Sequence, residues 1–128
     1  MKFLLDTHVI IWHFDDSPKL PKEITEIMKN SESKFYISSI SLWEIAIKMN
    51  LNKLDLSITF DELLSAVKKS DINILQIEDQ YLQGLSVLPF IHRDPFDRML
   101  IATAKSERLT ILTADENIQK YDVAWVWQ

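Results

Sequence analysis

The fold is decided at the start of the chain, which reads Lys2-Phe3-Leu4-Leu5-Asp6-Thr7-His8-Val9-Ile10-Ile11-Trp12. Its first four residues predict a short buried strand that ends at Asp6. The residues that follow predict a helix from Thr7 to Phe14. A buried strand that leads at once into a helix is typical of an α/β domain, in which helices connect parallel strands.

The rest of the chain repeats this alternation. Further strands are predicted at residues 35–38, 72–77, 109–112 and 123–126. Further helices are predicted at residues 21–30, 41–49, 60–67, 79–87 and 94–106, with a short one near Glu116. Because right-handed crossovers join such strands, we expect a single α/β domain over residues 1–128. It should have three α/β/α layers around a central parallel sheet of four to five strands.

The composition excludes several classes of protein. The chain has 128 residues, of which 47% are hydrophobic and 26% charged, with one glycine and no cysteine. Without cysteine, disulfides, thiolate catalysis and zinc–thiolate sites are excluded. A net charge of −5 argues against a general nucleic-acid coat protein, which would carry a basic face. No apolar stretch approaches the roughly 18 residues of a membrane helix, so we expect no membrane partner and a cytoplasmic location.

Four acidic residues lie in or beside apolar runs, where a carboxylate is costly unless a cation or hydrogen-bond donors compensate it. They are Asp6 after the first strand, Glu44 in Leu42–Ile47, Asp97 in Pro95–Ala102, and Asp115 after Thr110–Ala114. Parallel sheets bind ligands at the carboxyl ends of their strands, so we expect the four acids to converge there. A shared hard divalent cation, which takes oxygen ligands, is the simplest compensation.

Each acid also has a purely structural interpretation. Glu44 matches an S-x-x-E capping box with Ser41, or could pair with Lys48 one helical turn later. Asp97 could simply stabilise the start of its helix through the helix dipole. Asp115 could be a plain N-cap. Asp6 has no comparable alternative, because an acid at the end of a strand satisfies no obvious cap.

Asp94 precedes a proline and is predicted to be an N-cap, so we leave it out of the metal set. Arg93 and Arg98 flank this segment and are candidates for phosphate contact, although Arg98 could equally pair with Asp94. Thr7, Ser41 and Thr113 are candidates for orienting the acids, although hydroxyl groups also cap turns routinely.

Other known phosphate chemistries fit the sequence poorly. A dehalogenase-type phosphatase needs a second aspartate where the chain has His8, and a receiver domain needs an adjacent acidic pair where the chain has Asp6-Thr7. A single glycine leaves no glycine-rich phosphate loop.

The motifs resemble PIN domains, and most closely VapC-type toxins of bacterial type II toxin–antitoxin pairs. The resemblance rests on four segments in order across nearly the whole chain, namely Leu4–His8, Ser38–Lys48, His92–Ala102 and Leu112–Asp115. The acidic quartet of that family maps onto Asp6, Glu44, Asp97 and Asp115, and its polar position before the last acid maps onto Thr113. The roles of His8 and His92 stay open.

This resemblance implies an endoribonuclease that depends on Mg²⁺ or Mn²⁺, a small cognate antitoxin as partner, and a homodimer. Its carboxylates would hold the metal, and Arg93, Arg98 or Lys48 would contact the RNA substrate. Trp125 and Trp127 on the last strand are candidates for burial or for a subunit contact. Two alternatives remain: a catalytically silent module that binds RNA or a partner, and a metal-dependent hydrolase of DNA or small phosphates.

Overall fold

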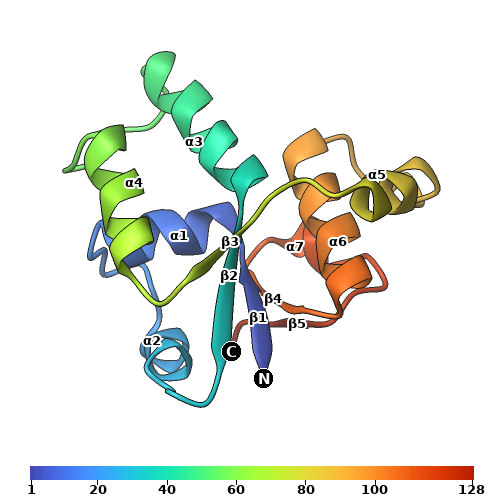
Figure 1. Cartoon of the computed structure of the whole chain (residues 1–128), viewed down its shortest axis with the longest axis horizontal. Helices are drawn as coiled ribbons and strands as arrows, with labels where there is room; N and C mark the ends of the chain where they lie inside the picture. Colours follow the sequence, from blue (N-terminus) through green and yellow to red (C-terminus); the bar gives the residue numbers. More distant parts are fainter.

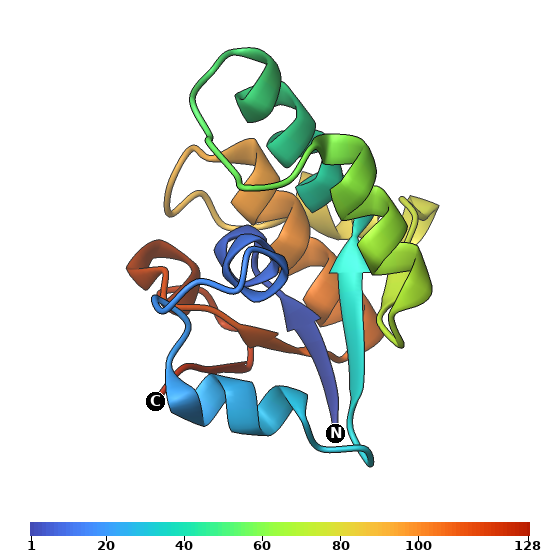
Figure 2. The same cartoon turned by 90° about the vertical axis from the view of Figure 1, so that its left-hand side faces the viewer.

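The computed structural model describes residues 1–128 and is built on an all-parallel sheet of five strands in the order β3-β2-β1-β4-β5. The strands are β1 (Lys2–Leu5), β2 (Lys34–Ser38), β3 (Asn73–Leu75), β4 (Thr110–Leu112) and β5 (Trp125–Val126). Both central strands, β1 and β2, point toward the end of the molecule at which α1 and α3 begin (Figure 2). The predicted parallel sheet is confirmed, with five strands.

Helices cover both faces of the sheet, which confirms the predicted three layers (Figure 1). The helices are α1 (Thr7–Phe14), α2 (Lys22–Met28), α3 (Ser39–Asn50), α4 (Phe60–Lys69), α5 (Asp79–Ser86), α6 (Pro95–Glu107) and α7 (Glu116–Gln119). None of these helices could serve as a membrane-spanning segment.

The central strand β1 contributes to the core on both faces, because successive side chains of a strand point in opposite directions. Phe3 and Leu5 belong to a buried cluster with residues of α1 to α4. Leu4 belongs to a second cluster with residues of α6 and the segment after β4. A strand that is buried on both faces must be apolar throughout, which is why Phe3-Leu4-Leu5 is so clear a signal in the sequence.

Helix α3 begins two residues earlier than predicted. Strand β2 runs directly into it, and the side chain of Ser38 caps the helix by accepting a hydrogen bond from the Ile40 amide at 3.1 Å. The predicted capping box of Ser41 and Glu44 is therefore wrong, because both residues already lie inside the helix. A capping box forms instead at the start of α4, between Thr59 and Glu62.

The outer strands are shorter than predicted. Strand β3 has three residues instead of six, and β5 has only two, Trp125 and Val126. Each is an edge strand that pairs on one side only, β3 with β2 and β5 with β4. Short edge strands leave few unpaired backbone groups for another chain to add to.

Candidate active site

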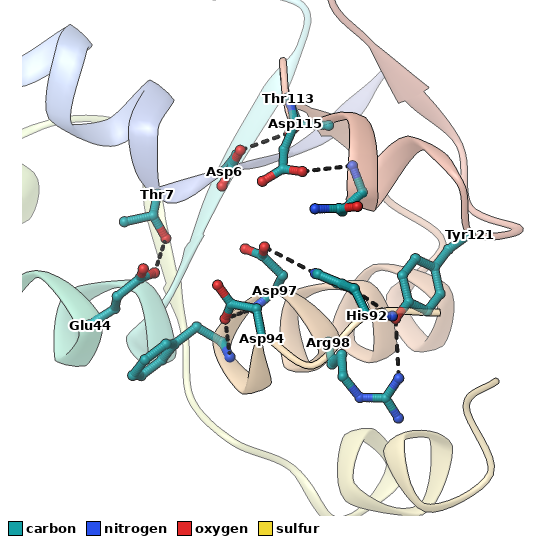
Figure 3. Close-up of polar contacts among 12 residues, drawn as sticks. Asp6, Thr7, Glu44, His92, Asp94, Asp97, Arg98, Thr113, Asp115 and Tyr121 are labelled. Atoms are coloured by element: carbon teal, nitrogen blue, oxygen red, sulfur yellow. Dashed lines mark hydrogen bonds and ion pairs between the residues drawn. The ribbon is translucent and has the colours of Figure 1, made fainter. Parts of the chain in front are cut away.

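The carboxyl ends of the central strands form the candidate site. Here β1 leads into α1, β2 into α3 and β4 into α7. The side chains of Asp6, Asp97 and Asp115 point into one region at this edge, and Glu44 lies at its border (Figure 3). These four acids are scattered over more than a hundred residues of sequence and are brought together by the parallel topology.

Asp6 is held by Thr113, which belongs to the segment after the neighbouring strand β4. Asp6 is only 3% exposed, and its Oδ2 accepts a hydrogen bond of 2.7 Å from the Thr113 hydroxyl. Although Asp6 occupies the N-cap position of α1, its side chain caps nothing. The Thr113 oxygen also accepts the Asp115 amide at 3.0 Å. Thr113 therefore fixes Asp6 and the backbone of Asp115 relative to each other.

Glu44 is buried and is held by residues of two helices. Thr7 Oγ1 lies 2.8 Å from Glu44 Oε1 and 3.0 Å from the hydroxyl of Ser41. A carboxylate can only accept, and Thr7 has a single hydroxyl proton. Thr7 therefore donates this proton to Glu44, and its oxygen accepts a hydrogen bond from the Ser41 hydroxyl. The second oxygen, Oε2, accepts from Lys48 Nζ at 2.6 Å. The ion pair between Glu44 and Lys48, which was one of the alternatives, is present.

Asp94 caps helix α6, as predicted. Its Oδ1 accepts hydrogen bonds from the amides of Phe96 and Asp97, at 2.9 Å and 3.1 Å. This cap sets the first turn of α6 and so places the Asp97 side chain, which is 11% exposed, at the sheet edge. The Asp97 carboxylate has a single hydrogen-bond partner, the imidazole Nε2 of His92 at 3.3 Å.

Asp115 also caps a helix, since its Oδ1 accepts the Asn117 amide at 2.7 Å. The interpretation of Asp115 as an N-cap is therefore confirmed. Capping uses one carboxylate oxygen, however, and the Asp115 side chain lies beside that of Asp6 (Figure 3). The same residue is thus placed to begin α7 and to contribute negative charge to the cluster.

Burial and repulsion from neighbouring acids shift the pKa values of Asp97 and Asp6 upward. The pKa of Asp97 is raised to about 8, first by burial and then by the charges of Asp94, Asp6, Asp115 and Glu44. Burial also raises the pKa of Asp6, as does Asp115, against the opposing effects of the Thr113 hydrogen bond and His8. Desolvation and like charges both disfavour the ionised form. The negative charges of Asp97 and Asp6 are therefore poorly compensated by the protein itself.

The chemistry of the donor set fits a hard divalent cation. All four acids offer carboxylate oxygens, which suit Mg²⁺ and Mn²⁺. In the geometry of the structure no three acidic or histidine side chains are close enough to hold one ion jointly. Mg²⁺ commonly keeps several waters and binds directly through one or two carboxylates, so this spacing suits an ion held in part through water.

The basic residues lie in different surroundings. Arg98 donates to the carbonyls of Pro89 and Leu88 and to the hydroxyl of Tyr121, which engages three of its five N–H donors. It forms no ion pair with Asp94. Arg93 is exposed. Tyr121 was missed from the sequence, because it lies far from every motif and becomes part of the site only through its contacts with His92 and Arg98.

Comparison with known proteins agrees with this fold. A family model described as the PIN domain matches residues 3–124. The chain therefore belongs to the PIN domain family. No curated protein sequence gives a match.

Solved structures with the same fold include chains of toxin–antitoxin complexes. The VapBC2 complex from Rickettsia felis, bound to a DNA fragment from its promoter, matches with a TM-score of 0.73 at 16% identity over 98% of both chains. The DNA-bound VapBC from Salmonella typhimurium matches with a TM-score of 0.70 at 23% identity, over 98% of this chain and 97% of the other. A toxin–antitoxin complex from Klebsiella pneumoniae matches with a TM-score of 0.68 at 19% identity, over 96% of this chain and 94% of the other. At these identities the likeness shows a shared fold.

Proposed function

We propose that this protein is a metal-dependent endoribonuclease and the toxin of a toxin–antitoxin pair. The observation that carries the proposal is the cluster of acids at the sheet edge, in which the pKa of Asp97 is raised to about 8 by burial and by four neighbouring carboxylates. A functional site is where such shifts concentrate. Membership of the PIN domain family supports the same activity.

Asp6, Glu44, Asp97 and Asp115 would hold the cation, Mg²⁺ or Mn²⁺. When bound, the ion supplies the positive charge that activates a water and offsets charge on the phosphodiester. The protein contributes the orientation of the acids: Thr113 holds Asp6, and Thr7 with Ser41 holds Glu44.

Of the three candidate RNA contacts, Arg93 is the best placed, because it is exposed and free of intramolecular hydrogen bonds. Lys48 is partly exposed at the border of the cluster, and its ion pair with Glu44 raises its pKa, so it stays positively charged. Arg98 is the weakest candidate, because three of its five N–H donors already bind backbone carbonyls and Tyr121. A backbone contact by Arg93 or Lys48 would orient the substrate without reading its sequence.

A cognate antitoxin is proposed as the regulatory partner. The structural neighbours include toxin–antitoxin complexes, which supports a partner of this kind. Large apolar side chains also lie exposed on the surface, among them Val87 at 80%, Phe90 at 71% and Trp43 at 59%. Exposed apolar surface of this kind is typical of protein contacts, and a homodimer would cover part of it.

Cleavage assays on three substrates test the function. We expect the purified protein to cut single-stranded RNA with Mg²⁺ or Mn²⁺, to stop in EDTA, and to leave DNA and a chromogenic phosphate ester intact. Equal cleavage of DNA or of the ester would favour a broader metal-dependent hydrolase. RNA binding without cleavage in any metal would favour a silent binding module. RNA cleavage that continues unchanged in EDTA would exclude the proposed mechanism.

A further inference from the structure

A hydrogen-bond chain connects Arg98 to Asp97 through Tyr121 and His92 (Figure 3). The hydroxyl oxygen of Tyr121 lies 3.1 Å from Arg98 Nη1, 3.2 Å from the backbone amide of His92 and 2.9 Å from His92 Nδ1. The other ring nitrogen, Nε2, lies 3.3 Å from Asp97 Oδ2. The chain is largely shielded from water, since Tyr121 is 5% exposed and the His92 side chain 13%.

The direction of each hydrogen bond follows from counting protons. The guanidinium of Arg98 and the amide of His92 can only donate, so they occupy both acceptor positions of the Tyr121 hydroxyl. The hydroxyl proton of Tyr121 is then left to donate to His92 Nδ1. A nitrogen that accepts carries no proton, so the ring proton of His92 is on Nε2 and is donated to Asp97 Oδ2.

We propose that Tyr121 and Arg98 lock His92 in the Nε2–H tautomer, and that His92 thereby acts as a positioning residue for Asp97. With Oδ2 held by His92, the other oxygen of Asp97 is left free to face the cation. This role rests on the proposed function, because it assumes that Asp97 is a metal ligand. Outer partners that orient ligands in this way commonly change metal affinity by roughly 10- to 100-fold when they are removed.

The opposite tautomer, with the ring proton of His92 on Nδ1, conflicts with the same count of hydrogen-bond donors and acceptors. If Nδ1 carried the proton, it would become a third donor to the Tyr121 oxygen, which has room for two. The lone pair of Nε2 would then face Asp97 Oδ2, and the contact would persist only if the carboxyl group were protonated. That contact would be lost when Asp97 ionises, as it must in order to bind a cation. The tautomer of His92 therefore decides whether this contact supports metal binding.

The first test is the ring ¹⁵N spectrum of His92 in metal-free protein at pH 9, where the Asp97 carboxyl is ionised as metal binding requires. We expect the chemical shifts of the Nε2–H tautomer in the wild type. In Tyr121→Phe, which removes the donor to Nδ1 and keeps the ring, we expect a shift toward Nδ1–H. Tyr36→Phe is the matched control, because the hydroxyl of Tyr36 makes no hydrogen bond within the protein. A wild-type spectrum of Nδ1–H or of imidazolium would overturn the proposal without any variant.

The second test is Mn²⁺ affinity, measured by calorimetry on the same proteins. We expect Tyr121→Phe to bind roughly 10-fold more weakly than wild type and Tyr36→Phe to bind equally well. His92→Gln, whose side-chain amide can still donate to Asp97, should retain more affinity than His92→Leu. Thermal melts confirm that each variant is folded.

The outcomes separate the positioning role from the proposed function. If wild type binds Mn²⁺ and Tyr121→Phe binds it equally well, the positioning role is wrong and the metal site stands. If wild type has the Nε2–H tautomer but binds no Mn²⁺, the metal site itself is wrong and the positioning role falls with it.

Discussion

Asp6 and Asp115 are the same residue type at the same edge of the sheet, yet their side chains have different local roles. Asp115 caps α7, whereas Asp6 at the start of α1 makes no cap and binds Thr113 instead. An asparagine caps a helix about as well as an aspartate, but it lacks the charge that a divalent cation requires. Exchanging each aspartate for asparagine therefore separates capping from metal binding.

We expect Asp115→Asn to have nearly the same free energy of unfolding as wild type and to lose nearly all RNA cleavage. Asp115→Ala should cost about 1 kcal/mol of stability in addition, because the cap is lost. Asp6→Asn should also lose cleavage, and metal-free melts should show unchanged or slightly higher stability, because repulsion among the acids is relieved. Denaturant titrations and a cleavage assay on the same samples measure both effects.

Asp71→Asn is the matched control, because Asp71 is an exposed acid outside the cluster. It should behave as wild type in both assays. Asp6→Asn that cleaves RNA at the wild-type rate would show that the site is wrongly assigned.

Asp97 should make stability depend on pH when no metal is present. Its pKa is about 8 in the folded protein against an ordinary value of 3.8. Between these values the folded protein binds a proton that the unfolded chain does not, so stability falls as pH rises from about 4 to about 8. The slope for one proton is at most about 1.4 kcal/mol per pH unit. Denaturant titrations in EDTA should show this fall in wild type and a shallower one in Asp97→Asn, and equal slopes would contradict the shift.

At the scale of elements, helix α6 depends on its cap, and the cap also influences the site. Asp94 binds two amides of the first turn, and its charge helps to raise the pKa of Asp97. We expect Asp94→Ala to destabilise the protein by about 1 kcal/mol and Asp94→Asn to preserve stability. Both variants remove a neighbouring negative charge, so both should lower the pKa of Asp97, as measured by carboxyl ¹³C titration. A pKa of Asp97 that stays unchanged in Asp94→Asn would mean that the cap and the site are independent.

Elements with strong local signals could be predicted from the sequence, and elements fixed by distant partners could not. The apolar run of β1 and the Asp94-Pro95 start of α6 are decided by neighbouring residues, and the structure has both as predicted. The sequence predicts the start of α3 two residues too late, because Ser38, Ser39 and Ser41 are all plausible N-caps. Ser38 is the N-cap in the structure because strand β2 ends at this residue. The extent of β3 was overestimated, because an edge strand ends where its partner β2 stops pairing.

The site was predictable only in part for the same reason. Asp6, Glu44, Asp97 and Asp115 could be chosen because each carries charge into an apolar run, and a parallel sheet predicts that such residues meet at one edge. The network of His92 and Tyr121 gave no such signal. Their contact depends on how the segment after α7 folds back over the start of α6, and no local pattern records that.

At the scale of the whole molecule, self-association is the expected way to cover exposed apolar surface. Val87, Phe90 and Trp43 are exposed, and Trp125 on the edge strand β5 is 41% exposed, whereas Trp127 packs against Trp12 within the protein. We expect a twofold dimer in sedimentation at tens of micromolar protein, since isologous contacts bury such surface on both copies. Phe90→Ser should shift the equilibrium toward monomer by roughly tenfold or more, corresponding to the loss of about 1.4 kcal/mol or more. The same substitution should leave the melting temperature of the monomer nearly unchanged.

Gln83→Ser, at an exposed polar position of α5, serves as the control and should keep the wild-type equilibrium. A wild-type protein that sediments only as monomer under these conditions would rule out the dimer without affecting the catalytic assignment.

The position of β1 at the centre of the sheet has a consequence for the protein during its synthesis. Its neighbour β4 and the Thr113 hydroxyl that holds Asp6 are translated well after β1, since Thr113 follows Asp6 by 107 residues. A nascent chain on the ribosome can form α1 to α4 early, but its acids cannot assemble until β4 has emerged and paired with β1. Long-range pairing of this kind is also slow to form. If the proposed ribonuclease activity is correct, the ribosome that makes this protein would be shielded from it until β4 has emerged and paired with β1.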